Sequence, residues 1–274
     1  MPLGGAPNLK PRSTSSEPLR STPISDFDAQ QYYQDFQNRK PNHQNASEII
    51  KELSQGLKKA EVEAQVDEDY KYFIPRCQQA KILSFDVIFK YIVMKKLSYN
   101  AQKATEMARW VTEHSSSLFA TLVCRERSED ICSLVEEGVS DGDLPLRRKF
   151  SGHTFYFQKQ SGDIISAMQH WDLEDLKEFG KAQYQFIAPV FTPGQREVYG
   201  DNIILPFIRH NGIITMEPTY GGYSRVFQKS IHPSHHEFWD RSTPQVISGV
   251  LRCSIPFTDF YALGTRKACG HQTT

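Results

Sequence analysis

The chain has 274 residues, and 32 lysine and arginine residues balance 32 aspartate and glutamate residues. This balance argues against a nucleic-acid or membrane surface that works through net charge, although local patches are compatible with it. The five cysteines are odd in number, scattered and without a C-x-x-C pair, which favours a reduced intracellular chain, cytoplasmic or nuclear. No signal peptide and no run of about 20 apolar residues occurs, so we expect no transmembrane segment.

Residues 1–43 are rich in proline, serine, asparagine and glutamine, and we expect them to form a disordered tail. Three aromatic residues of this tail, Tyr32, Tyr33 and Phe36, lie close together. They form either a short docking helix or an incidental polar and aromatic patch. The sequence alone favours the patch.

Residues 44–140 are predicted to form a helical domain, because apolar residues recur at helical spacing. Ser84 and Asn100 are placed to cap two of its helices, and Gly138 is placed to end the last one. We expect Met107 and Trp110 to pack in its core.

Residues 141–201 are expected to connect this domain to the next. Aromatic residues 155–157 favour a strand, and residues 172–181 favour one short helix that ends at Gly180. The carboxylates of this helix are interpreted as a solvated face, because no apolar pocket is implied around them.

The most informative stretch is 202–238, in which two apolar runs flank the glycine pair Gly221-Gly222. This pattern predicts a β-hairpin. Glycines also allow backbone N–H groups to approach phosphates, although a plain hairpin turn is the commoner explanation of a lone glycine pair. The candidate nucleotide-binding residues are Gly221, Gly222, Tyr223, Ser224 and Val226.

The same stretch resembles the glycine-rich loop that opens a protein kinase domain. More narrowly, it is similar to serine/threonine-kinase-like proteins of filamentous fungi. The segment Ile204 to Phe207 (I-L-P-F) precedes the loop, and the segment Ile231 to Phe238 (I-H-P-S-H-H-E-F) follows it. In the kinase pattern G-x-G-x-x-G-x-V, only Gly221 keeps a glycine, and Val226 matches the valine that packs on adenine.

Three earlier segments are similar to the same family, so the resemblance covers about residues 74–238. They are Leu118 to Val123 (L-F-A-T-L-V), Asp141 to Leu146 (D-G-D-L-P-L) and Gln185 to Phe191 (Q-F-I-A-P-V-F). The family assigns no chemistry to its helical part.

The resemblance implies ATP as the ligand, but no A-x-K segment follows Phe238, and the chain carries no H-R-D, D-F-G or A-P-E motif. We therefore assign no catalytic residue, expect no magnesium site and interpret the chain as a truncated, inactive kinase relative. Residues 239–274 match nothing in the family, and we expect an unspliced intron, a shifted frame or a truncated gene model. The histidines His232, His235 and His236 could also suggest a metal, but the family resemblance already accounts for them.

We expect an α+β fold in which a mainly helical N-terminal domain precedes an incomplete kinase-like hairpin of two or three strands. Because an isolated hairpin is marginal in water, residues 202–238 should be poorly ordered unless they pack on the helices. The expected partners are a nucleotide and a protein bound through the helical domain, with no nucleic acid and no membrane. The alternative function is a helical protein–protein interaction module with a vestigial kinase segment.

Overall fold

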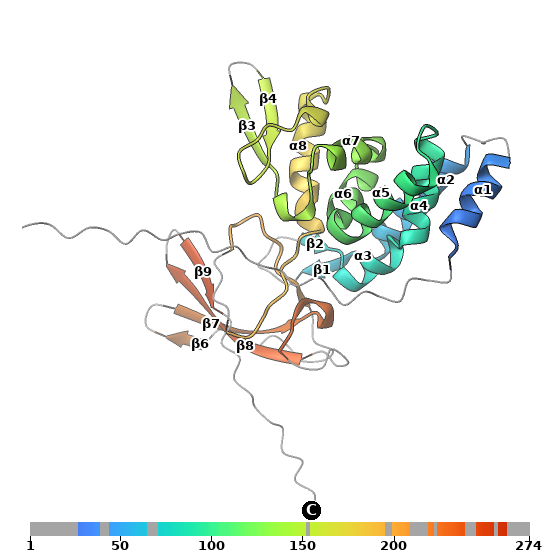
Figure 1. Ribbon diagram of the computed structural model, residues 1–274. Helices are drawn as coiled ribbons and strands as arrows, with labels where there is room; N and C mark the ends of the chain where they lie inside the picture. Colours follow the sequence, from blue (N-terminus) through green and yellow to red (C-terminus); the bar gives the residue numbers. More distant parts are fainter. Residues whose placement is uncertain are drawn as a thin grey trace, which may run out of the picture.

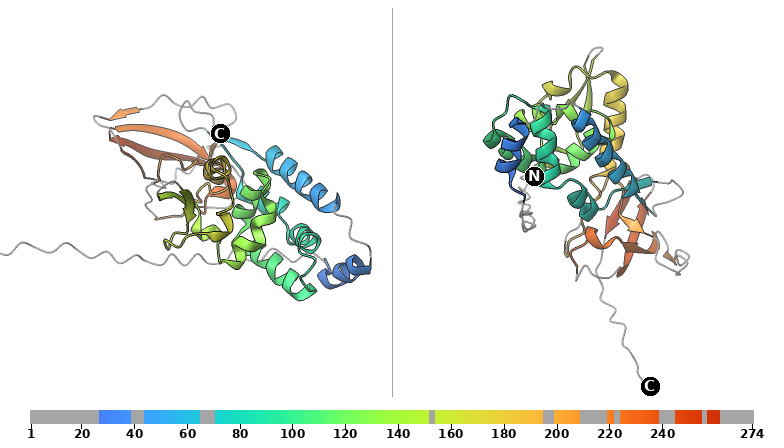
Figure 2. Two further views of the ribbon diagram at one scale, coloured as in Figure 1. Left: turned by 90° about the horizontal axis from the view of Figure 1, so that it is seen from above. Right: turned by 90° about the vertical axis from the view of Figure 1, so that its right-hand side faces the viewer.

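The computed structural model describes residues 27–38, 44–64, 71–151, 154–194, 199–208, 219–221, 224–238, 245–254 and 257–261. They form a helical body with a twisted antiparallel sheet beside it (Figure 1). Figure 2 shows the same arrangement from two further sides, with the sheet next to one end of the helices. The combination of helices and small antiparallel sheets confirms the α+β class.

The helical body is built from eight α-helices among the described residues, and none of these helices is long and apolar enough to cross a membrane. Five short 3-10 turns link or extend them. The helices are α1 (Ala29–Asn38), α2 (Gln44–Lys59), α3 (Arg76–Ile82), α4 (Phe85–Lys95), α5 (Ala101–His114), α6 (Ser116–Cys124), α7 (Ile131–Glu136) and α8 (Leu173–Ala182). The turns are η1 (Ser128–Asp130), η2 (Asp141–Asp143), η3 (Ser166–Met168), η4 (Gln183–Gln185) and η5 (Pro233–His235).

The strands form three antiparallel sheets. Two are pairs, β1 with β2 and β3 with β4, and the third has the order β5-β7-β8-β9, with β6 also paired to β7. The strands are β1 (Val62–Ala64), β2 (Lys71–Phe73), β3 (Arg147–Ser151), β4 (Thr154–Gln158), β5 (Phe207–Ile208), β6 (Thr219–Gly221), β7 (Ser224–Ile231), β8 (Gln245–Ser254) and β9 (Phe257–Tyr261).

The main hydrophobic core lies around α6, whose residues 118–123 are all buried. A helix that is apolar on every side belongs in the interior of a bundle, and α2, α3, α5, α7 and α8 all contact α6. The same core continues beyond the helices of residues 44–140 and takes in Phe157, Trp171 and Phe186.

The three predicted end residues lie at helix ends, and one of them, Ser84, makes no side-chain capping bond. The side chain of Asn100 accepts a hydrogen bond from the backbone N–H of Lys103 and so caps α5. Gly138, at φ 72°, follows α7. Its N–H donates to the Val135 carbonyl at 2.8 Å, and the N–H of Val139 donates to the Leu134 carbonyl at 2.9 Å, so these two carbonyls at the helix end are satisfied. Ser84 precedes α4 as predicted, but its hydroxyl donates to Asp86 at 2.5 Å instead of capping the backbone.

One expectation about packing and one about a helix end are wrong. Met107 is buried at 7% exposure, but Trp110, three positions on, is 43% exposed on the solvent side of α5 and packs on His114. The helix predicted to end at Gly180 continues to Ala182.

The aromatic segment of the N-terminal tail is a docking helix and not an incidental patch. Tyr32 and Phe27 contact the ring of Phe89 on α4, and the Tyr33 hydroxyl donates to the Tyr99 carbonyl at 2.8 Å. Residues 27–38 therefore do not belong to a disordered tail, while residues 1–26 and 39–43 lie outside the described residues.

The C-terminal sheet has five described strands, whereas two or three were expected. Strands β8 and β9 come from residues 245–261, which match no kinase segment. Residues 246–251 (V-I-S-G-V-L) contain four β-branched or apolar residues with strand propensity, and β8 pairs with β7 over seven positions.

Candidate nucleotide-binding hairpin

The glycine pair lies where β6 turns into β7, as predicted. Gly221 faces Ser224, and Thr219 faces Val226, in an antiparallel register with two residues between the strands. Those two residues, Gly222 and Tyr223, lie outside the described residues. The β-hairpin is thus confirmed, and a role in binding a nucleotide stays a prediction.

Strand β7 lies in the middle of its sheet, with β5 and β6 along one edge and β8 along the other. Val226 is opposite Thr219 on β6 and opposite Val250 on β8. The backbone positions of Gly221, Ser224 and Val226 therefore share one hairpin, supported by a neighbouring strand.

The segments on either side of the hairpin meet at its base. Phe207 of the I-L-P-F segment pairs with Ile231 of the I-H-P-S-H-H-E-F segment. Both are buried in a small cluster with Leu205 and Phe191, and the rings of Phe191 and Phe207 stack 6.0 Å apart. These segments, more than 20 residues apart in sequence, close the sheet against the body of the protein.

His235 joins the sheet to the helical body. The backbone N–H of Arg76 donates to Nε2 of His235 at 3.2 Å, and Nδ1 lies 3.0 Å from the Pro189 carbonyl. A carbonyl only accepts, so Nδ1 carries the proton. Nε2 accepts from the Arg76 N–H and therefore carries none, so the ring is neutral. Burial disfavours the charged ring and lowers the pKa of His235 to about 4.

The neighbouring histidines also have structural surroundings. The backbone N–H of Ser234 donates to Nδ1 of His232 at 3.2 Å, and burial lowers the pKa of His232 as well. The ring of Phe73 on β2 packs at interplanar angles of 87° and 89° against the rings of His232 and His235. A metal at Nε2 of His235 would have to displace the hydrogen bond from the Arg76 N–H, and the described residues contain no group of three metal-ligand candidates.

The Q-F-I-A-P-V-F segment completes this junction. The N–H of Phe191 donates to the carbonyl of His235, and the N–H of Glu237 donates to the carbonyl of Phe191, both at 2.9 Å. These bonds form a parallel bridge between Phe191 and His236.

The two earlier segments of the resemblance likewise contact each other. Asp141 accepts the backbone N–H groups of Ser117 and Leu118 at 2.9 and 2.8 Å, and so caps α6, which carries the L-F-A-T-L-V segment. Burial raises the pKa of Asp141, and these hydrogen bonds partly oppose the rise. Every segment that carries the resemblance, apart from the hairpin itself, thus has a structural role.

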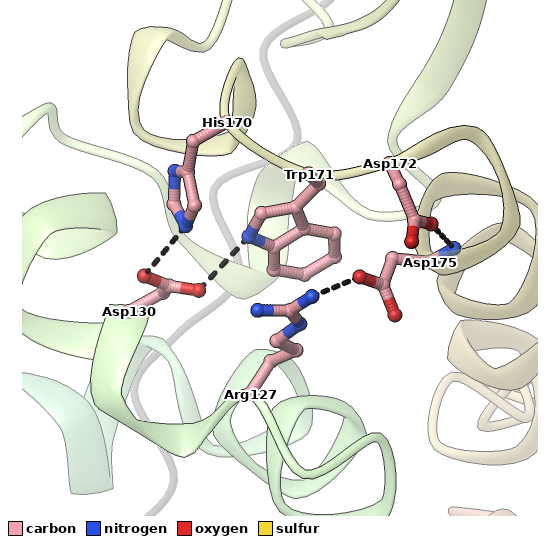
Figure 3. A network of polar contacts seen from close by, with 6 residues as sticks. All are labelled: Arg127, Asp130, His170, Trp171, Asp172 and Asp175. Carbon is pink, nitrogen blue, oxygen red and sulfur yellow. Dashed lines mark hydrogen bonds and ion pairs between the residues drawn. The ribbon is translucent and has the colours of Figure 1, made fainter.

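A polar network between η1 and α8 was not predicted (Figure 3). Asp130, 9% exposed, accepts the indole N–H of Trp171 at 2.9 Å, and its other oxygen lies 3.5 Å from Nε2 of His170. Arg127 lies over the Trp171 ring and forms an ion pair with Asp175.

This network fixes α8 on the helical body. Asp175 is therefore partly buried and paired, and the interpretation of the α8 carboxylates as a solvated face is wrong at this position. Asp172 caps α8 by accepting the N–H of Asp175 at 2.8 Å. The network holds no serine or cysteine nucleophile beside His170, so its geometry supports a structural clamp.

No protein-family model matches the chain, and neither the curated proteins nor the solved structures contain a match.

Proposed function

We propose that this chain is a serine/threonine-kinase-like protein in which a helical body supports a sheet that presents a glycine-rich hairpin to ATP. The observation that carries the proposal is the register of β6 and β7. Gly221 and Ser224 face each other across a two-residue turn, at the position that the kinase resemblance assigns to the phosphate-covering loop.

The surroundings of the hairpin support this proposal. A two-stranded hairpin alone is marginal in water, but β7 is paired along both edges and its end is buried beside Phe207 and Phe191. This support would hold the backbone N–H groups near Gly221 in place for a phosphate. In this proposal Val226 would lie against the adenine.

The proposed activity is nucleotide binding without phosphoryl transfer by this chain alone. Phosphoryl transfer needs a lysine for the α and β phosphates, a base and magnesium ligands. No A-x-K segment follows the hairpin, and the 274 residues contain no H-R-D or D-F-G motif that would supply them. No catalytic residue and no magnesium ligand is therefore proposed.

Thermal unfolding of the full chain, with and without millimolar ATP, tests the proposal. A ligand that binds only the folded state raises the melting temperature. We expect ATP to stabilise the wild-type chain and to have no effect on a Gly221→Val variant. A Gly200→Val variant is the control, because Gly200 lies in an open loop with no atom within 4 Å of an added Cβ. Absence of any ATP effect on the wild type contradicts the proposal.

A helical protein–protein interaction module is the second candidate function. It is favoured by the extensive buried cluster of the helical body, which gives this part of the chain a core of its own. If this function holds, a captured partner remains bound to the Gly221→Val variant. Loss of the partner in that variant would instead point to the hairpin.

A further inference from the structure

The β3–β4 hairpin stands out from the helical body beside α8 (Figures 1 and 2). All five residues of β3, from Arg147 to Ser151, are exposed. One edge of β3 pairs with β4, and no described residue bonds to its other edge. This open strand edge is not used by the proposed nucleotide site.

The equivalent edge of β4 is partly closed. The N–H of Ile165 donates to the carbonyl of Phe157 at 3.0 Å, and the N–H of Lys159 donates to the carbonyl of Asp163 at 2.9 Å. An isolated bridge joins Gln158 to Ile164 between these bonds. Of the two strands, only β3 offers a continuous free edge.

The register shows which backbone groups of β3 are available. Because the Phe157 carbonyl bonds away from β3, its partner position Arg148 belongs to a pair without ladder hydrogen bonds. Such pairs alternate along an antiparallel ladder, so Phe150 belongs to another. The N–H and C=O groups of Arg148 and Phe150 therefore point out of the open edge.

The side chains of this edge are strongly cationic. Arg147, Arg148 and Lys149 follow one another, and no ion pair joins any of them to a carboxylate of the described residues. Successive side chains of a strand point to opposite faces, so positive charge flanks both faces of the edge. The guanidinium group of Arg148 also lies 5.4 Å from the centre of the Phe155 ring.

An apolar contact surface lies next to these charges. Phe150 is 59% exposed, the largest exposed fraction among the large hydrophobic residues described. Its ring lies 4.7 Å from that of Phe155 across the hairpin. The edge thus presents an aromatic surface near the tip and positive charge toward the body.

We propose that β3 binds an extended acidic segment of another protein, which adds to the open edge as an antiparallel strand. Such a strand would place an apolar residue opposite Phe150, followed by acidic residues opposite Lys149, Arg148 and Arg147. Main-chain hydrogen bonds give affinity in strand addition, and cross-strand pairs of opposite charge or of apolar residues give selectivity.

Two features favour a peptide over a nucleic acid or a lipid surface. The free N–H and C=O groups of Arg148 and Phe150 complement a peptide backbone, which neither alternative supplies. A nucleic-acid strand follows one charged face with stacked bases, whereas here the cations flank both faces. Charged residues also protect strand edges from self-association, and if that were their whole role, no acidic peptide would bind.

Fluorescence anisotropy with the full chain tests the proposal. The probe is a short labelled peptide with a core of one valine followed by three glutamates. We expect saturable binding that weakens at high salt and that falls about tenfold in Arg147→Glu/Lys149→Glu. The matched control is Lys51→Glu/Lys58→Glu, which makes the same charge change at two exposed positions of α2 and leaves binding within twofold.

A second probe separates strand addition from simple charge attraction. The same peptide methylated on the backbone nitrogens of its valine and its second glutamate, which lie opposite Phe150 and Arg148, keeps its charge. It loses the N–H donors that would face β3 and places methyl groups against that edge, so we expect it not to bind. The proposal is overturned if the methylated peptide binds equally well, or if the first probe does not bind. It is also overturned if phosphatidylserine vesicles or an oligothymidylate bind more tightly than the peptide, with the same loss in Arg147→Glu/Lys149→Glu.

Discussion

His235 makes three kinds of contact at once, with the backbone of α3, with the carbonyl of Pro189 and with the ring of Phe73. Its neutral ring uses one nitrogen as donor and the other as acceptor. Protonation would put a second donor where the Arg76 N–H already donates. Protonation of His235 would therefore weaken the junction between sheet and helical body.

This sensitivity predicts a pH-dependent stability. The pKa of His235 is about 4 in the folded chain and near 6.5 when unfolded, so the unfolded state takes up the proton first as the pH falls. The stability that the neutral His235 ring contributes is fully present above pH 6.5 and is lost as the pH falls from there toward 4. Between pH 7 and pH 5 we expect about 2 kcal/mol less stability from this residue.

Urea unfolding at pH 7 and at pH 5 measures this loss of stability, with the His235→Asn variant as the reference. Asparagine does not titrate, and its amide can still donate to the Pro189 carbonyl. The other titrating groups are the same in both chains, so the difference between their pH dependences isolates His235. Equal losses in the two chains would show that the imidazole does not carry the effect.

At the scale of elements, α1 is the least embedded helix of the body. It has ten residues, none of them buried, and a helix of that length is marginal in isolation. Its contacts include the ring of Tyr32 against Phe89, the Tyr33 hydroxyl on the Tyr99 carbonyl, and Lys90 over the ring of Tyr32. Tertiary contacts with α4 therefore stabilise α1 as a helix.

We expect Tyr32→Ala to release α1 without unfolding the body. Amide hydrogen exchange of residues 29–38 should become fast, while exchange in α4 and α6 stays slow. Gln34→Ala, at an exposed position of the same helix, is the control and should change neither. Slow exchange of α1 in Tyr32→Ala would mean that other contacts hold it.

Local pattern predicted the elements whose signal lies within a few residues. The cap at Asn100, the glycine end at Gly138 and the hairpin at Gly221 are of this kind, because each depends on neighbouring residues. The missed features depend on partners that are distant in the sequence. Helix α1 packs on the ring of Phe89, Asp175 pairs with Arg127, and β8 pairs with β7. No spacing in the sequence reveals such pairs. Trp110 was misplaced because a small rotation about the axis moves a helical residue from core to solvent.

At the scale of the molecule, contacts described between the sheet and the helical body lie at the base of the sheet. The body has its own core around α6. The base of the sheet shares a small cluster of Phe191, Leu205, Phe207 and Ile231 and the hydrogen bonds of His235. Residues 202–238 were expected to be ordered only if they pack on the helices. The segments at the two ends of this stretch do so.

A helical body with its own core should stay folded when the sheet is weakened, and this predicts different results for two matched core substitutions. Ile231→Ala leaves a cavity at the base of the sheet, and Ile92→Ala leaves one in the helical body; each should cost about 2–5 kcal/mol where it acts. In Ile231→Ala we expect fast hydrogen exchange along β7 and unchanged exchange in α6. In Ile92→Ala both should exchange faster, because the sheet loses its support when the body opens. Loss of protection in α6 of Ile231→Ala would show instead that sheet and body unfold as one cooperative unit, and that the hairpin is as stable as the helices beneath it.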